Sequence, residues 1–262
     1  MEKRLRRGHL PKSRIIKKCN LLTLGERQLL EINGLSSGYG KIEVLHQINL
    51  HVDEGEVVSV LGANGAGKTT LMRTIINLIH ARSGTIKYRG KDITHLKTHQ
   101  IHALGIGIVP EGKRLFEKMT VMENLRMGCF LEKNERVIAE RIEKAFDMFP
   151  RLKERKDQLS GTMSGGEQAM LTIARGTMSD PDLLIMDEPS FGLAPVLINE
   201  MFSIIKRISQ EGKTVLLVEQ NAWKGLEISD RGYLLQKGEV ILEGKSSELK
   251  ENSLVKKAYF SN

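Results

Sequence analysis

Between positions 62 and 70 the chain reads Gly62-Ala63-Asn64-Gly65-Ala66-Gly67-Lys68-Thr69-Thr70. This stretch matches the Walker A pattern, in which two glycines separated by four residues precede Lys and Thr. It follows the apolar run Val57–Leu61, and apolar residues recur at helical spacing from Lys68 to Ile79. Strand, glycine loop and helix in this order form a phosphate cradle, because backbone N–H groups converge at the positive end of a helix dipole. We therefore predict that residues 62–70 bind ATP, that Lys68 reaches the β- and γ-phosphates, and that the Thr69 hydroxyl ligates Mg²⁺.

A second apolar run, Leu183–Met186, ends in the two acids Asp187 and Glu188. In open α/β sheets, ligands bind beyond the carboxyl ends of the strands. Asp187 is predicted to hold Mg²⁺, and Glu188 to position or deprotonate the attacking water. Adjacent strand residues point to opposite faces of a sheet, so we expect the two carboxylates to have different roles.

A third phrase, Ser164-Gly165-Gly166-Glu167, places small residues at the start of another helix, which makes a second anion-binding end. One nucleotide has no evident need of two such ends from one chain. With Walker A, this phrase and Walker B in that order, the chain resembles the ATP-binding subunits of ABC transporters. The resemblance implies a head-to-tail dimer of two ATP-binding subunits, in which Ser164 to Glu167 of one subunit cap the ATP bound by the other.

The resemblance narrows to the shorter ATPase subunit of branched-chain amino acid importers. It covers nearly all of residues 29–262 and depends on the phrases Gly105–Gly112, Phe149–Arg155, Gly192–Pro195, Leu217–Ala222 and Asp230–Tyr233. It implies ATP hydrolysis coupled to import, two membrane permease subunits and, indirectly, a solute-binding protein. The subunit is then expected at the cytoplasmic face of the inner or plasma membrane, with the permease near Glu111 and residues 120–160.

Three positions differ from the wider ABC pattern. Glu111 replaces the usual glutamine, and its carboxylate can still ligate Mg²⁺. Gln220 replaces a catalytic histidine that contacts the γ-phosphate; an amide can donate a hydrogen bond but adds no ionisation step near pH 6.5. Ala194 replaces an aspartate. Tyr39 matches the residue that stacks on adenine, although a tyrosine in a glycine turn can equally be structural.

The alternation of apolar strands with helices predicts an α/β fold of the P-loop NTPase type, with a mixed sheet covered by helices. Residues 120–160 differ, because they are charged and helical, with one apolar stripe. We therefore predict a core of residues 29–92 and 163–262 and an inserted α-helical subdomain of about 93–162. The members of the stripe are Ile138, Ile142, Ala145, Phe146 and Phe149.

Charge is concentrated at the beginning of the chain. Residues 1–28 hold nine Lys/Arg against two Glu, so they account for nearly all of the net charge of +8. The remainder is almost neutral, so nothing favours nucleic acid as a partner. The basic stretch is a solvated extension, the product of a start codon assigned too early, or a segment attracted to anionic lipid.

The remaining composition is that of an ordinary globular protein. No apolar run approaches the roughly 20 residues that cross a bilayer. Cys19 and Cys129 form no CxxC pair, which favours a reducing compartment. His95, His99 and His102 have helical spacing, but no carboxylate or cysteine completes a metal set, so a solvated helix face is favoured.

Several functions remain open beside import of branched-chain amino acids. Related importers of urea or amides share much of the pattern. Soluble ABC-type ATPases act on nucleic acid or ribosomes, and a regulator could bind nucleotide without hydrolysis. The partner ATPase is either a second copy or a paralogue.

Overall fold

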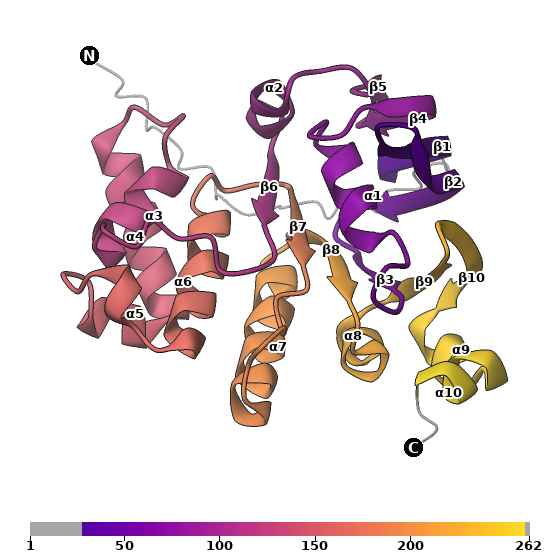
Figure 1. Cartoon of the computed structure of the whole chain (residues 1–262). Coiled ribbons are helices and arrows are strands. Elements are labelled where there is room, and N and C mark those ends of the chain that lie inside the picture. Colours follow the sequence, from indigo (N-terminus) through magenta and orange to yellow (C-terminus); the bar gives the residue numbers. More distant parts are fainter. Residues whose placement is uncertain (1–27, 260–262) are drawn as a thin grey trace, which may run out of the picture.

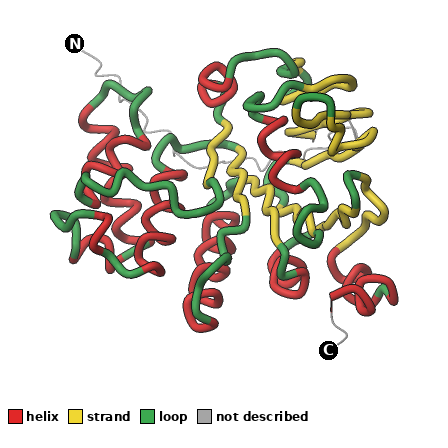
Figure 2. The backbone as a smooth tube through the Cα atoms, viewed as in Figure 1, coloured by secondary structure: helices red, strands yellow, loops and turns green. Residues whose placement is uncertain are grey.

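The computed structural model describes residues 28–259, which form two β-sheets with helices around them (Figures 1 and 2). The smaller sheet is antiparallel, with the strand order β2-β1-β4-β5. Its strands are β1 (Gln28–Tyr39), β2 (Ile42–Asp53), β4 (Ala81–Tyr88) and β5 (Lys91–Asp92). Gln28, which we assigned to the basic extension, already belongs to β1, and residues 1–27 lie outside the described part.

The larger sheet has the strand order β10-β9-β3-β8-β7-β6. Five strands are parallel and β10 is antiparallel to β9, so the sheet is mixed, as predicted. The three central strands are buried along their whole length, which explains their continuous apolar runs. The strands are β3 (Val57–Leu61), β6 (Ile106–Val109), β7 (Leu183–Asp187), β8 (Thr214–Glu219), β9 (Arg231–Gln236) and β10 (Glu239–Lys245).

Helices flank the larger sheet and α1 packs on the smaller one, and Figure 1 shows α3, α4 and α5 grouped at one end of the molecule beside α6. The first helix is shorter than predicted and ends at Ile75, because Asn77 takes a left-handed φ of 54°. The helices are α1 (Lys68–Ile75), α2 (Thr98–Ala103), α3 (Val121–Gly128), α4 (Glu135–Met148), α5 (Pro150–Glu154), α6 (Gly165–Thr177), α7 (Pro195–Gln210), α8 (Ala222–Ile228), α9 (Ser246–Glu251) and α10 (Ser253–Tyr259), with a 3₁₀ turn at Ser160–Thr162.

The predicted apolar stripe of the helical region is buried. Its five residues join one core with α6, α7 and one face of the larger sheet. The range 93–162 is not helical throughout, because it also contains β6, which pairs with β7 in the larger sheet. The division into a core and an insert remains a prediction.

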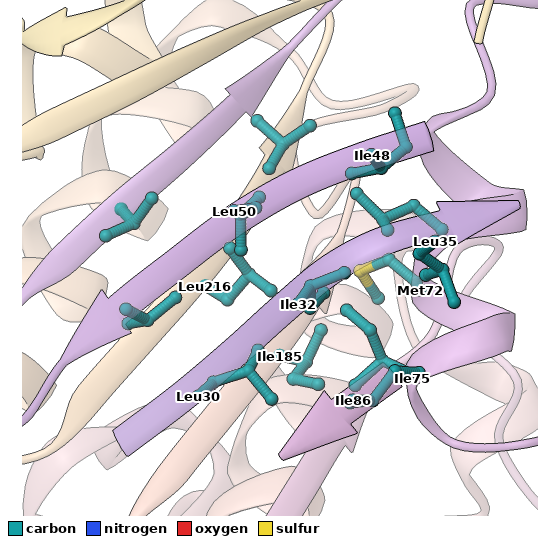
Figure 3. Packing of buried hydrophobic residues seen from close by; sticks show 14 of the residues in the cluster. Leu30, Ile32, Leu35, Ile48, Leu50, Met72, Ile75, Ile86, Ile185 and Leu216 are labelled. Carbon is teal, nitrogen blue, oxygen red and sulfur yellow. The ribbon is translucent and has the colours of Figure 1, made fainter. Parts of the chain in front are cut away.

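A second core lies between the two sheets and α1 (Figure 3). Leu30 and Ile86 of the smaller sheet meet Ile75 of α1, with Ile185 and Leu216 of the larger sheet beneath them. The start of α1 is thereby held against the carboxyl ends of the central strands. Between residues 28 and 259 we find no helix with the length and apolarity of a membrane span.

Candidate functional site

The predicted nucleotide residues meet at one edge of the larger sheet. The glycine loop follows β3, Asp187 ends β7, and Glu111 follows β6. These strands are parallel neighbours within the order β3-β8-β7-β6, so their carboxyl ends lie side by side. Residues that are about a hundred positions apart in the sequence therefore share one site.

The glycine loop has the backbone of a phosphate cradle. Gly65 and Gly67 adopt φ values of 78° and 109°, which side chains disfavour. At Gly62 a Cβ atom would lie only 2.6 Å from the Leu235 carbonyl oxygen. Gly67 is the N-cap of α1 and offers no side-chain acceptor, so the first N–H groups of α1 have no side-chain cap and can bind phosphate.

Lys68 is buried at the base of this loop. Its Nζ donates to the carbonyl oxygens of Gly62 and Ala63 at 2.8 and 3.1 Å. The same Nζ lies 2.9 Å from Glu188 Oε1, and the two side chains are only 3% and 10% exposed. The structure thus joins the two residues that we predicted to act on the γ-phosphate and the water.

Thr69, Asp187 and Glu111 are the residues that we predicted to ligate Mg²⁺. The Thr69 hydroxyl donates to Asp187 Oδ1 at 3.4 Å. Burial raises the pKa of Asp187 to about 6; the Thr69 bond opposes this rise, and the charges of Glu111 and Glu188 add to it. A divalent cation would compensate this buried charge, and hydroxyl and carboxylate oxygens are the ligands that Mg²⁺ takes. The residues therefore fit Mg²⁺.

The expectation that Asp187 and Glu188 point to opposite faces was wrong. Both side chains reach the glycine loop, since Asp187 bonds Thr69 and Glu188 pairs with Lys68. The strand ends at Asp187, and Glu188 adopts a φ of 45°. This turn breaks the alternation that holds only within a regular strand.

Gln220 lies in an open hollow together with Glu188. Ser190, Glu219 and Trp223 also line this hollow. The sequence did not single out Glu219 as a candidate site residue. Its signal was an acid at the end of the apolar run Thr214–Val218, directly before Gln220.

The residues Ser164 to Glu167 form the start of α6. Ser164 is the N-cap, and its hydroxyl accepts from Glu167 N at 3.4 Å. The Glu167 carboxylate accepts from Ser164 N at 3.0 Å and pairs with Arg155 at 2.8 Å, so it caps the helix. Gly166 packs on α7, because a Cβ atom there would lie 2.3 Å from Leu197 Cδ1.

The start of α6 is separated from the glycine loop of its own chain. Figure 1 shows α1 and α6 on opposite sides of β6 and β7. Helix α6 packs on α3 and β6, whereas α1 packs on β1 and β7. The contact of Ser164 to Glu167 with a nucleotide therefore remains a prediction about two chains.

Tyr39 ends β1 and is 45% exposed. Its hydroxyl accepts from Arg73 Nη1 at 3.3 Å. Since Arg73 belongs to α1, the Tyr39 ring is held close to the helix that follows the glycine loop. This position suits adenine stacking, which remains a prediction.

Comparisons with known proteins agree with this geometry. The ABC transporter family model matches residues 45–191. The high-affinity branched-chain amino acid transport ATP-binding protein BraG of Pseudomonas aeruginosa is 45% identical over 232 residues, which cover 88% of this chain and 99% of BraG. The probable branched-chain amino acid transport ATP-binding protein LivF of Archaeoglobus fulgidus is 36% identical, over 85% of this chain and 94% of LivF.

Solved structures have the same fold. A nucleotide-free ATP-binding cassette from an ABC transporter superposes with a TM-score of 0.78 at 26% identity, over 90% of this chain and 100% of that one. The ADP conformation of another ATP-binding cassette gives a TM-score of 0.77 at 27% identity, over 90% and 99%. The family model, the full-length relatives and the site at the sheet edge together show that this chain belongs to the ABC transporter family, as one of its ATP-binding subunits.

Proposed function

We propose that this chain hydrolyses ATP to energise an importer of branched-chain amino acids. The observation that carries the proposal is the match to BraG, whose name states that transport and whose length is covered almost completely. The convergence of Lys68, Asp187 and Glu188 supports hydrolysis rather than binding alone.

The geometry suggests how the chain's own residues act on ATP. Lys68 and the N–H groups at the start of α1 bind the phosphates. When bound by Thr69, Asp187 and Glu111, Mg²⁺ neutralises charge on the β- and γ-phosphates. A phosphate at Lys68 competes with Glu188 for the ammonium, which frees Glu188 to orient water. The water oxygen then bonds to the γ-phosphorus, the bond to the β–γ bridging oxygen breaks, and Glu188 accepts the proton.

Two subunits are proposed to close around ATP, with Ser164, Gly165 and Gly166 of one chain facing the γ-phosphate bound by the other. Moving an open-to-closed ratio from 1:99 to 99:1 requires about 5.5 kcal/mol of differential binding. Two bridged γ-phosphates are a plausible source of this energy. The partner is a second copy or a paralogue.

We propose that two permease subunits bind near Glu111 and α3, at the cytoplasmic face of the membrane, with a solute-binding protein on the other side. Phe116, Met127 and Phe130 expose 45, 39 and 59% of their surface in this region. An apolar surface of this kind is suited to a partner helix.

The experiment is to purify the membrane complex, identify its other subunits, and measure ATP hydrolysis in proteoliposomes. We expect stimulation by a solute-binding protein loaded with leucine, isoleucine or valine. We expect Glu188→Gln to bind ATP, lose hydrolysis and accumulate a closed dimer. Full turnover by a subunit that sedimentation shows to be monomeric would refute the two-chain site.

The same assay separates the alternatives. Stimulation only by a binding protein loaded with urea or an amide would show that the transported solute is urea or an amide. An ATP hydrolysis rate that is the same with and without the permease would favour a soluble ATPase. Equal, negligible rates for the wild type and Glu188→Gln in the complete complex would make the chain a regulator.

A further inference from the structure

Glu219 is a buried carboxyl group that the mechanism above does not use. It ends β8, in which every other residue is apolar except Thr214, and it is only 1% exposed. A buried glutamate without a cation as partner is rare, because burial disfavours its charged form. Its role therefore requires an explanation.

The Glu219 carboxylate binds the loop that follows β7. It accepts hydrogen bonds from the Ser190 hydroxyl at 2.8 Å and from Ser190 N at 3.2 Å. The backbone ladder between β7 and β8 has its last pair at Asp187 and Val218. Glu219 thus continues the connection between these two segments beyond the end of the ladder.

The loop that Glu219 binds contains a strained residue. Glu188 has a φ of 45°, a left-handed conformation that is disfavoured for a residue other than glycine. Its N–H donates to Val218 O at 2.9 Å, and Phe191 N donates to its carbonyl oxygen at 3.0 Å. Such a conformation persists only where the surroundings determine it, and the bonds from Ser190 to Glu219 complete that restraint.

We propose that Glu219 is a positioning residue for ATP hydrolysis, which holds the Glu188 turn and the adjacent Gln220 in one fixed arrangement. The inference depends on the proposed hydrolytic role of Glu188. It explains how Glu188 and Gln220, which follow the ends of two different strands, come to line the same hollow. A single carboxylate joins both segments, because it belongs to one and binds the other.

The charged groups around Glu219 make this restraint sensitive to pH. Burial raises its pKa to about 7; the bonds from Ser190 oppose the rise, and the charge of Glu188 adds to it. Lys68 is paired with Glu188 at 2.9 Å, and on α8, whose Gly225 packs on Glu219, Lys224 is paired with Glu227 at 2.9 Å. Asp187 adds another carboxylate at the end of β7. Protonation of Glu219 removes the charge that strengthens the two hydrogen bonds from Ser190, so positioning weakens below about pH 7.

The test compares Glu219→Gln with the wild type in the complete transport complex. Residues that orient catalytic groups typically contribute 10- to 100-fold, so we expect kcat to fall at least about tenfold. We expect the KM for ATP and the Kd for nucleotide to stay within about twofold. The fall of kcat below pH 7 should also disappear in the variant, whereas it should persist in Gln220→Ala at a lower rate. Glu239→Gln, the same substitution at an exposed position of β10, should match the wild type.

Three further variants separate positioning from loss of folding. Ser190→Ala should lower kcat in the same way. The double variant should be no slower than Glu219→Gln, because both substitutions disrupt the same contact between Glu219 and Ser190. Glu219→Asp, which keeps the charge, should recover part of the rate. An unchanged kcat, a KM that rises in proportion, or additive losses would overturn the inference.

The controls also distinguish this inference from the proposed function. If the wild type hydrolyses ATP and Glu188→Gln does not, the proposed function stands whatever Glu219→Gln does. If neither hydrolyses ATP in the complete complex, the proposed function fails and the positioning role fails with it.

Discussion

Removal of the Glu188 charge should destabilise the protein when no nucleotide is added. The substitution Glu188→Gln leaves Lys68 buried without its anion, since Lys68 is only 3% exposed and 2.9 Å from Glu188. At an effective dielectric constant of 20, this attraction amounts to about 6 kcal/mol. Desolvation of the two ions offsets much of it, and the carbonyl oxygens of Gly62 and Ala63 still accept from Lys68. We expect a net loss of about 2 kcal/mol.

The assay is thermal unfolding followed by circular dichroism, with and without MgATP. For a chain of this size the loss corresponds to a decrease in Tm of roughly 4–8 °C. Glu227→Gln is the matched control, because its partner Lys224 lies at the same 2.9 Å but the side chains are 50% and 29% exposed. That exposed pair should contribute less than about 1 kcal/mol.

Nucleotide should reverse the defect. Phosphate groups supply the negative charge that Lys68 lacks in Glu188→Gln, so saturating MgATP should raise the Tm of this variant more than that of the wild type. If Glu188→Gln without nucleotide is as stable as the wild type, the Lys68–Glu188 pair is not a stabilising contact and the reasoning is refuted.

Three further predictions concern separate parts of the site. Tyr39→Ala should raise the Kd for ATP several-fold, equivalent to about 1 kcal/mol. Tyr39→Phe loses only the hydrogen bond from Arg73 and should have a smaller effect. Equal binding of ATP by the wild type and both variants would contradict adenine stacking. Gly166→Ala should lower the free energy of unfolding by about 1–3 kcal/mol, because the new methyl group meets Leu197. Gly165→Ala should cost less, because its methyl group meets only the flexible end of Lys113. Urea denaturation measures both free energies, and equal losses would contradict this packing argument. The pKa of Glu219 is raised from 4.5 to about 7, so the folded chain binds this proton more tightly than the unfolded chain. The stability that this proton contributes is fully present below about pH 4.5 and is lost as the pH rises through 7. Glu219→Gln should therefore gain up to about 3 kcal/mol relative to the wild type between pH 5 and pH 8 in urea denaturation, and a difference that does not change with pH would contradict the shift.

Much of this protein could be predicted from local patterns. The limits of β3 follow from its apolar run, and the helix after Gly67 follows from the glycine loop. The loop itself is recognisable because its chemistry requires adjacent residues, so Lys68 and Thr69 are identified by position alone. The mixed sheet and the buried stripe of the helical region were predicted correctly for the same reason.

Other features depend on contacts between distant segments, which a local pattern does not contain. Tertiary structure alone placed Glu188 beside Lys68, because the strand ends at Asp187 and the chain turns at Glu188. It also gave Glu219 its proposed role, since nothing in the sequence shows that Ser190, in the loop after another strand, donates to this carboxylate. Composition and spacing determined which groups the chain carries, whereas the packing of parallel strands decided which of them meet and how strongly burial shifts their pKa values.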